Sequence, residues 1–189
     1  MLMPCAKPET MLAAKSKVIA CLFFIPAKVS LSLDKMEHKI YDLKEAKLRI
    51  EQYCAKEDRC QQQVLDKLRN YGLSSGVAED FLIELILGKF VDEERYARSF
   101  CRGKFKIKKW GRRKITFELK KKRVSDICIS KGLEEIEEDE YLETLTGLLY
   151  KKEALVKDTN LFARKKKMAD YMVRKGYEPD LVWEAVRKL

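Results

Sequence analysis

From about residue 40 onward the sequence repeats itself, and this repeat limits the possible folds more than any other feature. Three segments that begin at Val64, Ile115 and Met168 align in one register, with offsets of 51 and 53 residues. Six aligned columns hold apolar residues or residues suited to a turn: Leu68, Leu119 and Met172; Gly72, Arg123 and Gly176; Leu73, Val124 and Tyr177; Val77, Cys128 and Leu181; Leu82, Leu133 and Val186; Leu85, Ile136 and Leu189. Such a period is typical of arrays in which one supersecondary unit stacks on the next.

Each repeat is expected to contain three helices. Apolar residues recur at helical spacing in the first helix of each repeat, which we place at 42–57, 92–107 and 139–156. Each of these helices begins near an aspartate that suits capping or the helix dipole: Asp42, Asp92 and Asp139.

The second helix of each repeat is predicted to end where the chain enters the left-handed region. Gly72 and Gly176 stand at this position in the outer repeats, and glycine adopts that conformation freely. Arg123 stands there in the middle repeat. We therefore expect that this turn is strained or closes differently.

The predicted fold class is all-α, with three tandem three-helix repeats that form an elongated, curved array of nine helices. The low content of breakers, 8 Gly and 4 Pro in 189 residues, also favours helix over sheet. Repeat 1 is placed at 36–88, repeat 2 at 89–138 and repeat 3 at 139–189.

Residues 1–35 do not share the repeat and are interpreted as an extension outside the domains. Their apolar run, Val18 to Ile25, is shorter than the roughly 20 residues that span a bilayer. Met36 precedes the first helical segment and could be the initiator. A signal peptide or an interfacial segment is the alternative interpretation.

The cysteines and the single histidine argue against a metal site or a catalytic centre. None of the six cysteines forms a C-x-x-C pair, and His38 is the only histidine. The sequence also lacks the nucleophile-elbow, phosphate-loop and dinucleotide-binding motifs. We expect no enzyme, no metal and no cofactor, and a protein of the reducing cytoplasm. Acid pairs such as Glu93 and Glu94 are interpreted as solvated charge.

The net charge of +10 is concentrated in the middle repeat. Residues 89–124 hold fifteen Lys or Arg and four Asp or Glu, a net charge of +11. Because few acids accompany these basic residues in the sequence, we interpret them as a binding face for phosphates or carboxylates. The predicted contact residues are Arg95, Arg98, Arg102, Lys104, Lys108, Lys109, Arg112, Arg113, Lys120 and Lys121.

Two aromatic residues stand among these basic residues. Trp110 and Phe117 could stack on exposed bases. For Trp110 we favour packing against the turn between two helices.

Three motifs in the middle repeat resemble the RecX family of recombinase regulators. They are Phe90-Val-Asp-Glu-Glu-Arg-Tyr-Ala97, then Trp110-Gly-Arg-Arg-Lys-Ile115, then Leu119 and Val124. The resemblance extends over about residues 40–189 and is strongest at 89–124. The sequence departs from the family pattern at Arg123, where glycine is usual, and at Cys60, where the first unit often has serine.

The resemblance implies a small all-helical protein that binds the RecA recombinase filament on DNA. Such a protein restrains strand exchange, ATP hydrolysis and coprotease activity, and needs no catalytic residue, metal or cofactor. It further implies a monomer that contacts single-stranded DNA and has no membrane partner. The alternative is a sequence-tolerant nucleic-acid-binding helical repeat with no recombinase partner.

Overall fold

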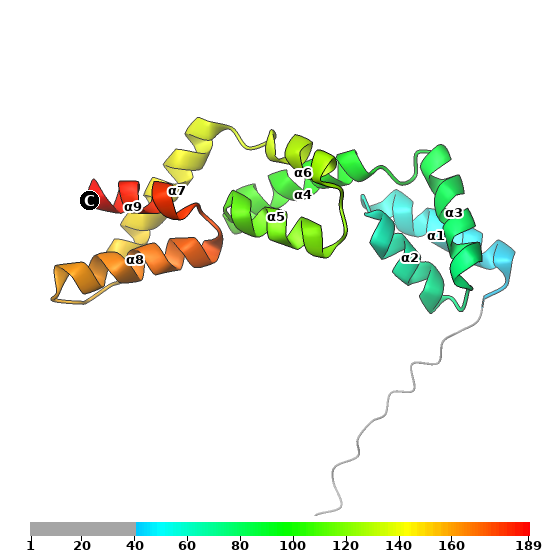
Figure 1. The fold of residues 1–189 in the computed structure, drawn as a ribbon. Helices are drawn as coiled ribbons and strands as arrows, with labels where there is room; N and C mark the ends of the chain where they lie inside the picture. The colour runs from blue at the N-terminus through cyan, green and yellow to red at the C-terminus, as the bar shows by residue number, and fades with distance from the viewer. Residues whose placement is uncertain (1–40) are drawn as a thin grey trace, which may run out of the picture. The chain divides into compact units, whose positions relative to one another are not determined.

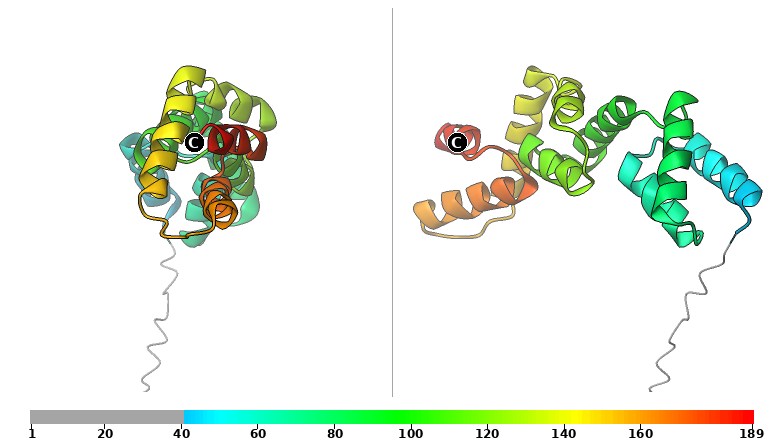
Figure 2. Two further views of the ribbon diagram at one scale, coloured as in Figure 1. Left: turned by 90° about the vertical axis from the view of Figure 1, so that its left-hand side faces the viewer. Right: turned by 45° about the vertical axis from the view of Figure 1, so that its right-hand side comes forward.

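A computed structural model describes residues 41–189, in which nine helices and no strands occur (Figure 1). The predicted all-α repeat array is confirmed. Repeat 1 contains α1 (Leu43–Lys56), α2 (Gln61–Asn70) and α3 (Ser75–Leu87). Repeat 2 contains α4 (Glu93–Lys108), α5 (Arg112–Lys121) and α6 (Asp126–Leu133). Repeat 3 contains α7 (Glu138–Glu153), α8 (Leu161–Lys175) and α9 (Pro179–Arg187), coloured yellow to red in Figure 2. The predicted extension 1–35 and His38 lie outside the described residues.

The second helix of every repeat closes in the same way. The N–H groups of Leu73, Val124 and Tyr177 donate to the carbonyls of Leu68, Leu119 and Met172, five residues earlier, at 3.4, 3.2 and 3.2 Å. These six residues are two of the aligned sequence columns, so the backbone hydrogen bonds repeat in the register that the sequence predicts. A bond of this span is the signature of the Schellman motif.

The residue inside each closure has a positive φ, including the arginine. The φ angles are 84° at Gly72, 58° at Arg123 and 96° at Gly176. The expectation of strain at Arg123 is therefore confirmed, because a left-handed conformation costs a non-glycine residue about 1–2 kcal/mol. The turn keeps the geometry of its neighbours and does not close differently.

The first helices begin close to the predicted residues, with one difference. The side chain of Asp92 accepts a hydrogen bond from the Arg95 N–H at 2.9 Å, as expected of an N-cap. Asp42 occupies the cap position of α1 without such a bond. In repeat 3 the cap is Glu137, so Asp139 lies within the first turn of α7. There it favours the helix through the dipole rather than through a capping bond.

Within residues 41–189 the apolar core consists of two clusters rather than three. One cluster belongs to repeat 1, apart from Val91 just before α4, and includes Ile50, Leu68 and Leu85. The other is shared by repeats 2 and 3 and takes one buried residue, Cys60, from repeat 1. Repeats 2 and 3 thus share one core, whereas repeat 1 has its own.

Repeats 2 and 3 meet through backbone atoms at the start of α5. The N–H of Gly111 donates to the carbonyl of Lys175 at 2.9 Å, and that of Arg113 donates to the carbonyl of Gly176 at 3.0 Å. A Cβ atom at position 111 would overlap with the backbone of Gly176. Gly111 is therefore required for close approach.

We predict that Gly111→Ala lowers the free energy of unfolding by roughly 2–3 kcal/mol, because the added methyl group has no space. Gly147→Ala on α7 is the matched control. No atom lies within 4 Å of its added Cβ, so we expect a gain of about 0.5–1 kcal/mol from helix propensity. Denaturant unfolding of both variants measures the difference. Equal effects of the two substitutions would contradict this account of the junction.

Candidate nucleic-acid and partner interface

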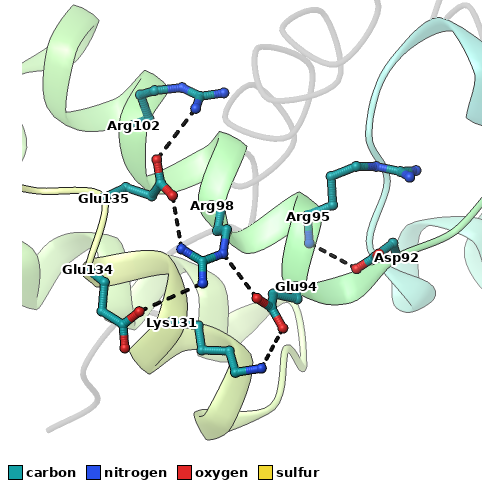
Figure 3. Close-up of polar contacts among 8 residues, drawn as sticks. All are labelled: Asp92, Glu94, Arg95, Arg98, Arg102, Lys131, Glu134 and Glu135. Carbon is teal, nitrogen blue, oxygen red and sulfur yellow. Dashed lines mark hydrogen bonds and ion pairs between the residues drawn. The ribbon is translucent and has the colours of Figure 1, made fainter.

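The arginines on the outer face of α4 are held by acidic residues. Arg98 contacts Glu94 at 3.0 Å and Glu135 at 2.9 Å (Figure 3). Glu135 also contacts Arg102 at 3.4 Å, and Glu94 contacts Lys131 of α6 at 2.6 Å. Hydrogen bonds from Lys131 and Arg98 lower the pKa of Glu94. This network ties α4 to α6 and to the turn that follows α6.

Arg95 connects repeat 2 to repeat 1. Its Nε donates to Asp58 Oδ1 at 2.7 Å, and the hydroxyl of Ser99 donates to Asp58 Oδ2 at 2.8 Å. One carboxylate in the loop between α1 and α2 therefore binds two side chains of α4. Partial burial acts to raise the pKa of Asp58, but the hydrogen bonds from Ser99 and Arg95 outweigh it and lower the pKa.

Arg112 connects repeat 2 to repeat 3. Its guanidinium contacts Glu138 at 2.7 Å, and its Cζ atom lies 4.3 Å from the ring centroid of Tyr141. The Tyr141 hydroxyl accepts from the Arg112 N–H at 3.2 Å and donates to Glu178 at 2.6 Å. Like Arg95 and Arg98, Arg112 is part of the internal structure.

The expectation that these basic residues lack nearby acids is therefore wrong for four of the predicted arginines, Arg95, Arg98, Arg102 and Arg112. Of their partners, Glu94 lies inside the stretch 89–124 over which the charge was summed, whereas Asp58, Glu135 and Glu138 lie outside it. In the folded chain these acidic side chains form ion pairs with the arginines. Lys120 is paired as well, with Asp126 at 3.0 Å.

Two lysines lie over the ring of Trp110. The ammonium of Lys114 is 4.6 Å from the ring centroid, and that of Lys104 is 5.4 Å away. Trp110 is partly buried against the core shared by repeats 2 and 3. This placement agrees with a packing role for Trp110. Lys109 ends α4 in the left-handed conformation, with φ of 52°, and its ammonium lies 5.7 Å from the ring of Phe105.

Five of the predicted contact residues form no ion pair within residues 41–189: Lys104, Lys108, Lys109, Arg113 and Lys121. Arg113 and Lys121 are exposed on α5, eight residues apart, with Phe117 between them. The Phe117 side chain is 66% exposed. We call Arg113, Phe117 and Lys121 the α5 stripe, since their spacing of four residues places them on one side of the helix.

The internal repeat supplies a comparison for the α5 stripe. The aligned positions are Gln62, Asp66 and Asn70 on α2, and Lys166, Asp170 and Arg174 on α8. Both outer repeats have aspartate where the middle repeat has Phe117. The combination of two basic residues with an exposed aromatic ring, and without a carboxylate, is therefore specific to the middle repeat.

Comparison with known proteins identifies the family. The sequence model "RecX, second three-helix domain" matches residues 92–133, and "RecX, third three-helix domain" matches residues 138–186. The chain belongs to the RecX family. The two matched segments correspond closely to repeats 2 and 3.

Relatives named "Regulatory protein RecX" include those of Bacillus mycoides strain KBAB4, 24% identical over 148 residues, and Bacillus cereus strain B4264, 23% identical. Each alignment covers 78% of this chain and 55% of the relative. The chain thus spans about half the length of these RecX proteins.

Solved RecX structures share the fold. The crystal structure of RecX from Lactobacillus salivarius matches with a TM-score of 0.70 and 19% identity, covering 77% of this chain and 95% of that one. A second crystal structure of regulatory protein RecX matches with a TM-score of 0.70 and 20% identity, covering 77% of this chain and 73% of that one.

The described part of the chain contains no group of three or more potential metal ligands and no helix that is long and apolar enough to cross a membrane. Cys54, Cys60, Cys101 and Cys128 are free thiols. Burial raises the pKa of Cys54 to about 11 and that of Cys101 to about 12, so these thiols remain protonated and act as apolar packing groups.

We predict that the contribution of Asp58 to stability depends on pH. Because its pKa is lower in the folded chain, this contribution is present above the unfolded value of about 3.9 and is lost as the pH falls through the folded pKa. Asp58→Asn should lower the free energy of unfolding by about 1 kcal/mol or less at pH 7. Below the folded pKa the two proteins should converge.

The measurement is denaturant unfolding of wild type and variant across the acidic range. Asp80→Asn, at an exposed position on α3, is the control and should change the free energy little at any pH. A difference between wild type and Asp58→Asn that stays constant down to the lowest pH would contradict the assignment.

Proposed function

We propose that this protein binds the RecA recombinase filament on DNA and restrains its ATP hydrolysis, strand exchange and coprotease activity. Membership of the RecX family carries the proposal, since the second and third RecX domains both match. The name of the relatives, regulatory protein, points to control of another protein rather than to catalysis. The free thiols are consistent with action in the reducing cytoplasm.

Within this function, we assign contact with single-stranded DNA to the α5 stripe and to the predicted contact lysines nearest to it in the sequence, Lys109 and Lys120. Arg113 and Lys121 are exposed and unpaired within the described residues, so they can bind phosphates without first breaking an ion pair. The exposed ring of Phe117 lies between them, where an unstacked base could stack on it. The paired arginines contribute to the local positive potential and hold the helices that carry the stripe.

The alternative is a sequence-tolerant nucleic-acid-binding protein without a recombinase partner. The α5 stripe alone favours it, because a basic and aromatic face needs no second protein to bind a strand. The two functions differ in their effect on RecA. Only the first predicts that the recombinase itself is altered.

We predict that the double variant Arg113→Glu, Lys121→Glu weakens binding to single-stranded DNA at least tenfold. With about five phosphate contacts, log affinity of the wild type should fall with log salt at a slope of roughly −3.5, and loss of two contacts should reduce the slope to about −2. Phe117→Ala should weaken binding by about 1–3 kcal/mol without changing the slope.

The matched control is Lys166→Glu, Arg174→Glu, which reverses the same charges at the aligned positions of α8. Fluorescence anisotropy of a labelled oligonucleotide, measured over a range of salt concentrations, gives both affinity and slope. Equal losses in the two double variants would show a diffuse charge effect and would count against the α5 stripe.

We predict that the protein, at stoichiometric excess, lowers the rate of ATP hydrolysis by RecA on single-stranded DNA several-fold. The reaction is followed by phosphate release with and without the protein. An unchanged rate would reject the regulatory function. If the protein still bound bare DNA tightly under the same conditions, the alternative function would be supported.

A further inference from the structure

A groove of about 380 Å³ lies where repeat 1 meets repeat 2. On one side it is lined by α4, and on the other by the loop between α1 and α2. Tyr96, Phe100 and Ile107 supply its apolar surface. The Ile107 side chain is 77% exposed, so its apolar surface is accessible to a partner.

The middle of the groove is open because residue 103 has no side chain. Gly103 lies within α4, with ordinary helical neighbours, and lines the groove. A Cβ atom at this position would have no heavy atom within 4 Å. Glycine inside a helix costs about 0.5–1 kcal/mol relative to alanine, and here no contact with another element requires it. Its effect is to leave space for an apolar group.

The acidic residues that line the groove already form ion pairs, whereas the lysines that line it do not. Its acidic wall, Glu57 and Asp58, is already engaged: Glu57 pairs with Arg59 at 2.9 Å, and Asp58 is held by Arg95. On the α4 side, Lys108 has no ion pair in the described part of the chain. Lys104 contacts only aromatic rings, at 5.1 Å from Phe100 and 5.4 Å from Trp110. The charges free to bind a partner are therefore positive.

The apolar surface, the acidic wall and the unpaired lysines together distinguish a nucleic-acid partner from a protein partner. A nucleic-acid strand carries a phosphate at every nucleotide and would bring such charges against the carboxylates of Glu57 and Asp58. A protein segment can place one apolar side chain in the groove and its carboxylates on the lysine side only. The charge pattern therefore favours a protein segment.

We infer that this groove is a docking site for an acidic protein segment, which inserts an apolar side chain over Gly103 and places its carboxylates beside Lys104 and Lys108. The inference rests on the proposed function, of which it names the protein-binding surface, with the segment lying on the recombinase. It separates the protein contact, at the junction of repeats 1 and 2, from the DNA contact on α5. An occupant would touch both repeats and so brace the junction between the two cores.

The decisive variant is Gly103→Leu, which fills the groove from within. Leucine favours helix, and a Cβ atom at position 103 has no heavy atom within 4 Å, so the fold should be retained, which circular dichroism and unfolding would verify. Gly147→Leu on α7 introduces the same side chain at another open helical glycine and is the matched control. Ile107→Asp is a second variant, which places a negative charge at the groove without filling it.

We expect Gly103→Leu and Ile107→Asp to raise the concentration needed for half-inhibition of the RecA ATPase at least tenfold. Their affinity for single-stranded DNA should equal that of the wild type, and Gly147→Leu should match the wild type in both assays. Full inhibition by folded Gly103→Leu would overturn the inference. Weakened DNA binding by this variant would also overturn it, because the groove would then serve nucleic acid. If the wild type itself left the RecA ATPase unchanged, the proposed function would be rejected. The assignment of the docking segment to the recombinase would be rejected with it.

Discussion

The hydrogen bonds between the end of α8 and the start of α5 determine how repeats 2 and 3 fit together. The last carbonyls of one helix accept from the first N–H groups of the other, so opposite ends of two helix dipoles face each other. The contact requires that no side chain stands at Gly111, and the left-handed Gly176 brings the carbonyl into place. With this joint formed, the two repeats close over one core.

The same joint determines how α5 can bind a nucleic acid. A helix N-terminus is often a site for phosphate, because its N–H groups have no partner in the helix. In α5 the N–H groups of Gly111, Arg112 and Arg113 are already bonded to Lys175, Tyr141 and Gly176. The end of α5 is therefore unavailable, and phosphates must be met by side chains along its exposed face. This is why the spacing of Arg113, Phe117 and Lys121 matters.

Local features of this fold could be predicted from the sequence, whereas the ion pairs could not. The closure after α5 follows from its alignment with two glycines, and even the strain at Arg123 can be inferred because its neighbours in the register need a positive φ. The acidic partners of Arg95 and Arg98 could not be predicted from the sequence. Asp58 and Glu135 each lie 37 residues away in sequence, and only the packing of α4 against other elements brings them near. A sum of charges along the chain cannot distinguish an arginine that binds a ligand from one that binds its own fold.

The ion pairs of the middle repeat indicate that arginine and lysine have different physical roles there. The planar guanidinium donates in several directions at once, and Arg98 uses it to join Glu94 and Glu135. Lysine presents a compact charge on a flexible chain, which suits a partner whose position varies. In the middle repeat most arginines hold neighbouring elements together, and several lysines remain exposed. Arg113 and Arg123 differ from the other arginines of this repeat, since both are exposed and neither forms an ion pair within residues 41–189. The net charge of +11 at residues 89–124 therefore overstates the number of groups that can bind a partner, and the predicted contact residues without an ion pair in the described part of the chain lie at the end of α4 and on α5.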